Sequence, residues 1–151
     1  MSLEDKIIKK LNSSFLKPNK NLVGIGDDCA YLGLEDLLIS TDTFIENTHF
    51  DLKKSSPVQV AKKFFNANYS DLQSSGGRPL YCFLNISFAK TKSAFIHYFL
   101  KELTSLLKKY KIILMGGDTT NSITDISLTM TLIGKPFQKK IFLRANAKEQ
   151  E

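Results

Sequence analysis

Residues 37–50 read Leu-Leu-Ile-Ser-Thr-Asp-Thr-Phe-Ile-Glu-Asn-Thr-His-Phe, a stretch that combines a predicted strand with a dense group of ligand-type side chains. The apolar residues 37–39 begin a predicted strand, and hydroxyl, carboxylate and imidazole groups then crowd into the next ten positions. Three further acidic segments end apolar runs: residues 26–28, 70–71 and 116–118. Carboxylates drawn toward a core are costly unless they are paired or bound to a metal. We therefore expect these four places to meet around metal ions and a phosphate.

The segments before and after this stretch predict the elements that carry it. Residues 29–32 and 37–44 predict two strands joined as a hairpin, and residues 3–16 place apolar groups at helical spacing on an exposed arm. Residues 55–57, Ser-Ser-Pro, predict the start of a helix, because serine caps free backbone N–H groups and proline suits the first turn. This helix is expected to run to about Ser74, before two glycines and a proline.

The second half of the chain predicts two more layers of the same domain. One strand is indicated by five apolar residues that alternate onto a single face: Leu80, Cys82, Leu84, Ile86 and Phe88. Residues 92–110 predict an amphipathic helix, residues 112–115 a short buried strand, and residues 125–134 a final strand. The order predicts an α+β domain: a mixed sheet of four strands, or slightly more, with two long helices on one face.

Composition narrows the class of protein. At 151 residues the chain has the size of one domain, and its net charge of +6 comes from lysines scattered in pairs, which argues against a nucleic-acid partner. No apolar run approaches the roughly 18 residues that span a membrane, and residues 1–6 lack the order of a signal peptide. We therefore expect a cytoplasmic protein with no membrane partner. Cys29 and Cys82 are expected in the core, since no Cys-x-x-Cys or Cys/His pairing accompanies them.

The pattern of phosphate-binding motifs also points toward a metal. The chain contains neither a Gly-x-x-x-x-Gly-Lys-Ser/Thr loop nor the protein-kinase signatures. Gly24-Ile25-Gly26 lacks the third glycine of a dinucleotide fingerprint, and the following Asp27 and Asp28 would repel a pyrophosphate. A hard divalent cation resolves this conflict, because it prefers oxygen ligands and neutralises both carboxylates and phosphates. Each acidic residue alone fits a cap or a turn, whereas the four places together predict a shared cation site.

Three other reactive side chains receive different interpretations. His49 has no partner pattern of a hydrolytic triad, so a structural role and a contact with a substrate phosphate both stay open. His97 lies inside an amphipathic helix and is expected to be structural. Cys29 adjoins an acidic pair that would raise the pKa of its thiol, which argues against a nucleophilic role.

Four blocks of the sequence resemble, in order, the motifs of the thiamine-monophosphate kinase family. This family is related to aminoimidazole ribonucleotide synthetase, selenophosphate synthetase and a hydrogenase maturation factor. The blocks are residues 24–30, residues 40–50, residues 68–72 and residues 116–120, and Leu143-Arg144 resembles the basic segment that closes the family's first domain. The match covers essentially the whole chain, and residues 40–50 are its most specific part.

The resemblance implies ATP-dependent phosphorylation of thiamine monophosphate to thiamine diphosphate, with Mg²⁺. It implies metal ligands at seven positions: Asp27, Asp28, Ser40, Thr41, Asp42, Asp71 and Asp118. It further implies that His49 contacts the substrate and that Gly117, Asp118 and Arg144 contact the ATP phosphates. No covalent nucleophile is implied; Asp42, Asp71 and Asp118 would stabilise charge, as phosphoryl transfer requires. The family fold also implies a homodimer through the sheet.

Residues 1–151 are expected to form a single N-terminal ATP- and metal-binding domain, without the family's C-terminal domain. The sequence departs from the family at residues 73–79, where alanines and a methionine are usual, and at Asn47-Thr48, which replaces a glycine-containing pair. Two alternatives therefore stay open. One is another ATP-using member of the same superfamily, and the other is a catalytically incomplete dimerisation domain.

Overall fold

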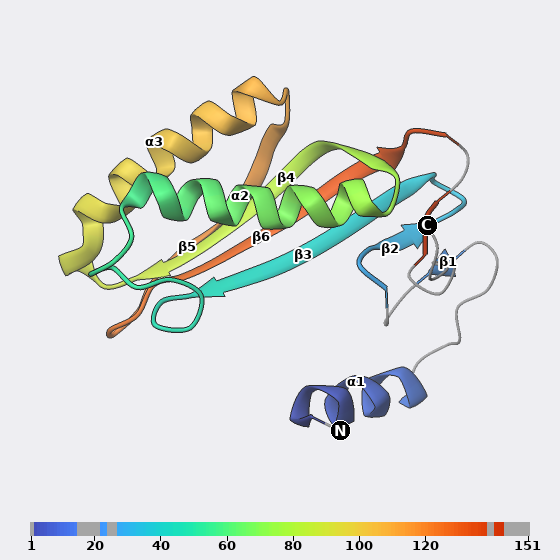
Figure 1. The fold of residues 1–151 in the computed structure, drawn as a ribbon, viewed down its shortest axis with the longest axis horizontal. Helices are drawn as coiled ribbons and strands as arrows, with labels where there is room; N and C mark the ends of the chain where they lie inside the picture. The colour runs from blue at the N-terminus through green and yellow to red at the C-terminus, as the bar shows by residue number, and fades with distance from the viewer. Residues whose placement is uncertain (1, 15–21, 24–26, 139–140, 144–151) are drawn as a thin grey trace.

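The computed structural model describes residues 2–14, 22–23, 27–138 and 141–143. Its centre is a six-stranded mixed sheet in the order β1-β2-β3-β6-β4-β5 (Figure 1). The strands are β1 (Leu22–Val23), β2 (Ala30–Leu32), β3 (Leu37–Ile45), β4 (Gly77–Phe88), β5 (Ile113–Asn121) and β6 (Ser127–Pro136). Neighbouring strands in this order are antiparallel except β4 and β5, which are parallel. The six strands agree with the expected mixed sheet of four strands or slightly more, and the short β1 adds to the hairpin of β2 and β3.

Two long helices cover one face of the sheet. The helical elements are α1 (Leu3–Ser14), α2 (Pro57–Ser74), the 3₁₀ turn η1 (Lys90–Lys92) and α3 (Ser93–Lys109). Figure 1 shows α2 and α3 side by side over the sheet and α1 apart from this layer. The predicted α+β architecture is confirmed, and the predicted arm helix is exposed along its apolar side at Ile7, Ile8 and Leu11. Among the helices that the structure describes, none is long and apolar enough to cross a membrane.

The core lies between the two helices and the sheet. The predicted alternation holds in β6, where Leu128, Met130 and Leu132 are fully buried, and in β4, where Cys82 and Leu84 are buried. The other side of the sheet carries no helix in Figure 1, and we call it the open face. Among its residues in β3, β6 and β4 are Thr41, Thr43, Tyr81, Phe83, Asn85, Thr129 and Thr131. Hydroxyl hydrogen bonds join Thr41 to Thr131 at 3.0 Å and Thr43 to Thr129 at 2.8 Å across this face.

A strand forms where residues 112–115 predicted one, but it is neither short nor buried. β5 extends through both glycines to Asn121, and every one of its residues is exposed at this edge of the sheet. A bulge at Met115 shifts the register, so that Leu114 pairs with Cys82 and Gly116 with Phe83. Alternation in the sequence cannot reveal such a bulge in advance.

The helix start predicted at residues 55–57 is confirmed. Ser56 accepts a hydrogen bond from the Gln59 N–H at 3.2 Å, and the Ser56 N–H donates to Gln59 Oε1 at 2.8 Å. This capping box satisfies two backbone donors that the first turn would leave without partners. It fixes the point at which α2 begins to cross the sheet toward the residues of the candidate site.

Candidate metal and phosphate site

Four of the predicted ligands lie on the helix-covered side of the sheet, around the middle of β3. Ser40 and Asp42 alternate with exposed residues and so face the same way as the core residue Leu38. Asp71 lies near the end of α2, and Ser74 of the same helix donates to Asp28 Oδ2 at 3.4 Å and to the Asp71 carbonyl at 2.8 Å. We call these ligands the acidic cluster: Asp28, Ser40, Asp42 and Asp71.

Cys29 marks the place where three members of the cluster meet. Its thiol donates to the Asp71 carbonyl at 3.4 Å and is buried. Burial is the main cause that raises the pKa of this thiol, and the charges of Asp71 and Asp28 raise it further, while hydrogen bonds with Ser75 and Ser40 oppose the shift. The predicted direction of the shift is therefore correct, although burial outweighs the neighbouring carboxylates as its cause.

Asn68 adds a buried polar atom that has no hydrogen-bond partner. Its side chain is fully buried, its Nδ2 donates to the Phe64 carbonyl at 2.9 Å, and its Oδ1 has no hydrogen-bond partner. Phe64, one turn earlier in α2, packs edge-on against Phe44 of β3 at 5.3 Å between ring centroids. Leu72, one turn later, reaches the Gly77 position together with Leu38 of β3. Asn68 therefore lies over the part of β3 between these contacts, which carries Ser40 and Asp42.

The donor set of the cluster fits Mg²⁺. Carboxylates, a hydroxyl and an amide carbonyl are hard oxygen ligands, and a buried carbonyl oxygen without a partner is expected to receive a cation or a water. Across residues 2–14, 22–23, 27–138 and 141–143, however, no three His, Cys, Asp or Glu side chains are close enough together to hold an ion. In the described residues, the carboxylates of the cluster are therefore not close enough together to enclose a metal ion.

Two of the predicted metal ligands lie differently from the cluster. Thr41 points to the open face, where its hydroxyl bonds to Thr131, because adjacent residues of a strand face opposite sides. Asp27 is half-buried next to the cluster, and its Oδ1 accepts from the Asp28 N–H at 2.9 Å. The structure brings Asp27 near the cluster and separates the Thr41 side chain from it.

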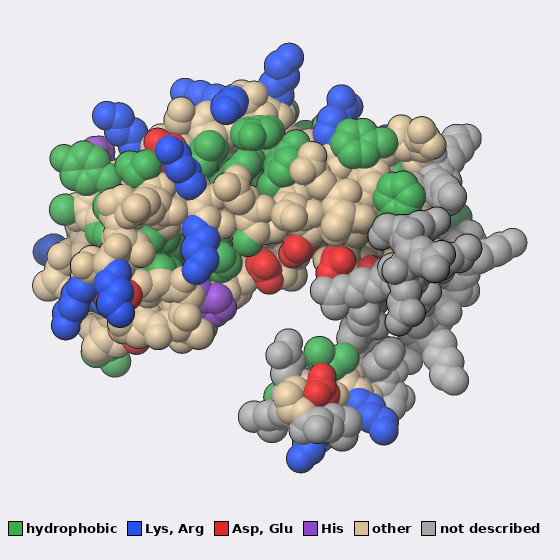
Figure 2. Space-filling model, viewed as in Figure 1, with side chains coloured by type: hydrophobic (Ala, Val, Ile, Leu, Met, Phe, Trp, Pro, Cys, Tyr) green, Lys and Arg blue, Asp and Glu red, His purple; other side chains and the backbone are tan. Residues whose placement is uncertain are grey.

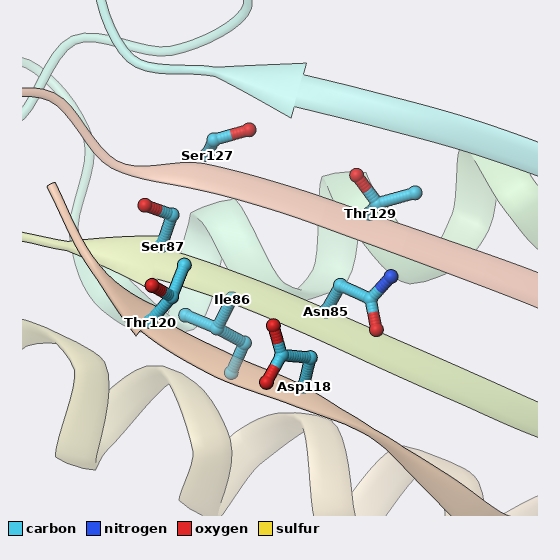
Figure 3. A pocket seen from close by; sticks show the side chains of 7 residues that line it. All are labelled: Asn85, Ile86, Ser87, Asp118, Thr120, Ser127 and Thr129. Atoms are coloured by element: carbon cyan, nitrogen blue, oxygen red, sulfur yellow. The ribbon is translucent and has the colours of Figure 1, made fainter.

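Asp118 is the predicted ligand that lies farthest away. It lies on β5, where it pairs with Asn85 of β4, and β5 is three strand spacings from β3, which is about 14 Å at the usual spacing of roughly 4.8 Å. A pocket surrounds it on the open face, lined by Asn85, Ile86, Ser87, Asp118, Thr120, Ser127 and Thr129 (Figure 3). The chain as folded therefore does not bring Asp118 to the acidic cluster.

Gly117, beside Asp118, has a backbone conformation that requires glycine. Its φ is +151°, and a Cβ there would overlap the backbone carbonyl of Leu84. The third predicted ATP contact, Arg144, lies outside the described residues, as do Gly24, Ile25 and Gly26 of the first sequence block.

His49 lies just beyond the C-terminal end of β3. Its ring stacks on Phe44 at 5.1 Å, and Phe44 follows Asp42 on the same side of the strand. Figure 2 shows a row of acidic side chains along the underside of the main body, above the separate helix α1, with a histidine at one end. The second histidine, His97, is an exposed residue of α3 whose ring contacts Tyr98, and the structural role expected for it stays a prediction.

Sequence reasoning assigned no role to three residues around this row. Lys63 of α2 donates to the His49 carbonyl at 2.6 Å, Glu46 is buried beside Lys92, and Asn68 carries the orphaned oxygen described above. A lysine among many others carries no distinguishing signal. The helical spacing of Phe64, Asn68 and Leu72 could have revealed Asn68, because it places a polar residue on the buried stripe of α2.

Comparison with known proteins gives a consistent family. Residues 26–135 match the family model "AIR synthase related protein, N-terminal domain". Among curated proteins, the chain is 38% identical over 149 residues to a thiamine-monophosphate kinase of Buchnera aphidicola subsp. Schizaphis graminum, covering 96% of this chain and 45% of that protein. It is 40% identical over 118 residues to the thiamine-monophosphate kinase of Leptospira interrogans, covering 75% and 38%. The chain thus spans less than half the length of these relatives.

Solved structures share the fold. The thiamine monophosphate kinase of Aquifex aeolicus superposes with a TM-score of 0.71 at 20% identity, covering 93% of this chain and 45% of that chain. AaThiL complexed with AMPPCP and TMP gives a TM-score of 0.74 at 21% identity, covering 98% and 47%. The resemblance expected from the four sequence blocks is confirmed by these relatives, and the chain belongs to the family of AIR synthase related protein N-terminal domains.

Proposed function

We propose that this chain is the N-terminal domain of a cytoplasmic, ATP-dependent kinase that converts thiamine monophosphate to thiamine diphosphate with Mg²⁺. The observation that carries the proposal is the acidic cluster on the helix-covered side of β3, which continues along the strand to His49. The 38% and 40% identity to thiamine-monophosphate kinases supports this substrate over those of other superfamily members.

The chemistry assigned to the residues follows from their positions. Bound Mg²⁺ would supply the positive charge that offsets the phosphates in phosphoryl transfer. Asp28, Ser40, Asp42 and Asp71 would hold it from β3, α2 and the segment before β2, with Asp27 beside them. His49 and Lys63 lie together at the far end of the row, where a hydrogen-bond donor and a cation suit the phosphate of thiamine monophosphate.

Gly117 and Asp118 are assigned to the nucleotide phosphates from the family resemblance, at a place on β5 apart from the cluster. Both the Asp118 pocket and the Thr41 hydroxyl lie on the open face, whose Tyr81 and Phe83 are 39% and 40% exposed. Burying these rings against a second copy favours a homodimer through the sheet. Arg144 remains an assignment from the sequence alone.

Metal binding by the chain itself tests the assignment. Thermal unfolding with and without Mg²⁺ should show metal-linked stabilisation that is reduced in Asp42→Asn and Asp71→Asn, because a ligand that binds only the folded state stabilises it. Asp51→Asn, which removes a carboxylate outside the cluster, is the matched control. Equal stabilisation of the wild-type chain and both cluster variants would contradict the proposed site.

Ligand binding and turnover test the substrate. The isolated chain should bind Mg²⁺–ATP weakly, prefer thiamine monophosphate to selenide or an aminoimidazole precursor, and form little or no thiamine diphosphate. Preference for another substrate in this panel would assign the chain to a different branch of the superfamily. Robust formation of thiamine diphosphate would contradict the view that the site is incomplete in this domain.

A further inference from the structure

The loop after β3 is folded back on its own strand. The Thr48 and His49 N–H groups both donate to the Ile45 carbonyl, at 3.2 and 2.8 Å, and the Asn47 N–H donates to the Phe50 carbonyl at 2.8 Å. Asn47 adopts a φ of +62°, a left-handed conformation that asparagine tolerates better than most residues. Residues 46–50 therefore form a tight loop that returns the His49 ring to the strand from which the loop departs.

The His49 ring is held by two contacts that leave one nitrogen for a ligand. The Ile45 N–H donates to His49 Nδ1 at 3.0 Å, and the ring stacks on Phe44 with an angle of 17° between the planes. Because Nδ1 accepts this hydrogen bond, the proton of the neutral imidazole belongs on Nε2. Lys63 Nζ lies 5.7 Å from the centroid of the Phe44 ring and donates to the His49 carbonyl. An N–H donor and a cation are thus placed side by side.

The buried carboxylate of Glu46 holds this loop in place. Its side chain is buried, and Lys92 Nζ of η1 donates to its two carboxylate oxygens at 2.6 and 2.5 Å. The same carboxylate accepts from the Ile126 N–H at 2.8 Å, while the Glu46 N–H donates to the Ile126 carbonyl at 2.9 Å. Residues far apart in the sequence are therefore joined at one point next to the His49 loop. Removing one member of a buried ion pair is costly, since the other charge is left without a partner.

We propose that Glu46 and Lys92 are positioning residues, which fix the 46–50 loop so that His49 presents Nε2–H to a ligand phosphate. They touch neither the acidic cluster nor the proposed substrate and act through the loop alone. The identity of the phosphate as thiamine monophosphate rests on the proposed function; the coupling between the ion pair and the imidazole does not.

Two backbone amides report separately on the two ends of this arrangement. The Ile126 N–H reports on the Glu46 carboxylate, and the Ile45 N–H reports on His49 Nδ1. Hydrogen exchange followed by NMR should show that Lys92→Met and Glu46→Gln lower protection of both amides by about tenfold or more. His49→Ala should lower protection at Ile45 alone. Lys90→Met, which removes an exposed lysine of the same 3₁₀ turn, should change neither amide.

The outcome at Ile45 decides the proposal. Loss of protection at Ile126 with full protection at Ile45 would overturn it, because the ion pair would then stabilise β6 without holding the imidazole. Protection of the core amide of Met130 shows whether each variant remains folded. If Lys92→Met fails this check, Glu46→Gln carries the comparison, since it removes the charge that holds Lys92 while keeping the size of the side chain.

Titration with thiamine monophosphate separates this inference from the proposed function. Joint loss of Ile45 protection and a tenfold or greater rise in Kd in Lys92→Met would support both. Loss of protection in a chain whose wild type does not bind the ligand would support the positioning role and count against the proposed substrate. Loss of protection with an unchanged Kd would overturn the positioning of His49 for this phosphate.

Discussion

At the scale of single residues, Gly117 shows how narrowly the edge of the sheet is specified. Its backbone lies so close to Leu84 that a Cβ has no room, while the adjacent Gly116 has only the Phe83 ring nearby, at 3.7 Å from a Cβ. The two glycines look equivalent in sequence, yet only Gly117 has the positive φ that side chains rarely adopt.

Substitution of these glycines should therefore have unequal effects. Gly117→Ala is expected to lower the free energy of unfolding by about 2 kcal/mol or more, because it combines an unfavourable φ with a backbone clash. Gly116→Ala is the control and should change stability far less. Urea unfolding of both variants makes the comparison, and equal effects would show that β5 can move away from β4 at no cost.

Asn68 gives a second prediction at this scale. Its buried Oδ1 lacks a partner, so Asn68→Leu should leave the metal-free protein as stable as the wild type or slightly more stable. The same substitution should reduce the stabilisation by Mg²⁺, because it removes an oxygen that lies over Ser40 and Asp42. Thermal unfolding with and without Mg²⁺ measures both effects, with the exposed Asn66→Leu as the control. A large loss of stability without metal would indicate that a water already satisfies this oxygen.

At the scale of elements, the sequence predicted most accurately what depends on local chemistry. The helix start at Ser56 follows from hydroxyl capping, and the buried faces of β4 and β6 follow from strict alternation. The same alternation could have placed Thr41 on the opposite face from Ser40 and Asp42. The distance of Asp118 from the cluster could not be predicted, because it depends on the strand order and on a bulge within the pairing of β4 with β5.

The capping box provides a test of how α2 is anchored. Ser56→Ala should lower the free energy of unfolding by about 1 kcal/mol, because the Gln59 N–H loses its acceptor at the start of the helix. Ser55→Ala, one residue earlier, should have a much smaller effect. Denaturant unfolding of the two alanine variants provides the measurement, and a neutral Ser56→Ala would mean that packing alone fixes the first turn.

At the scale of the whole molecule, the two faces of the sheet differ in what covers them. One face is covered by α2 and α3, whereas the open face displays aromatic rings beside threonine hydroxyl pairs (Figure 1). The proposed homodimer would cover this face and the edge strand β5. It would also cover the pocket of Asp118, which opens on this face.

A charge on the open face should prevent this association. Phe83→Glu is expected to shift the protein toward the monomer, because a dimer interface would bury the new carboxylate without a partner. Tyr98→Glu, at an exposed aromatic residue of α3, is the matched control and should leave the mass unchanged. Sedimentation equilibrium measures both variants, and a wild-type chain that remains monomeric at high concentration would contradict the dimer.

The position of β6 in the sheet has a consequence for synthesis of the chain. β6 lies between β3 and β4 in the sheet but follows both of them in the sequence. β3 can therefore pair with β6, for example at Asp42 and Met130, only after β6 has been synthesised. Until residue 136 has left the ribosome, β3 and β4 each expose an unpaired inner edge, and such edges are prone to aggregation. The strand β3, which carries Ser40 and Asp42, is therefore paired on both of its edges only after β6 has been made.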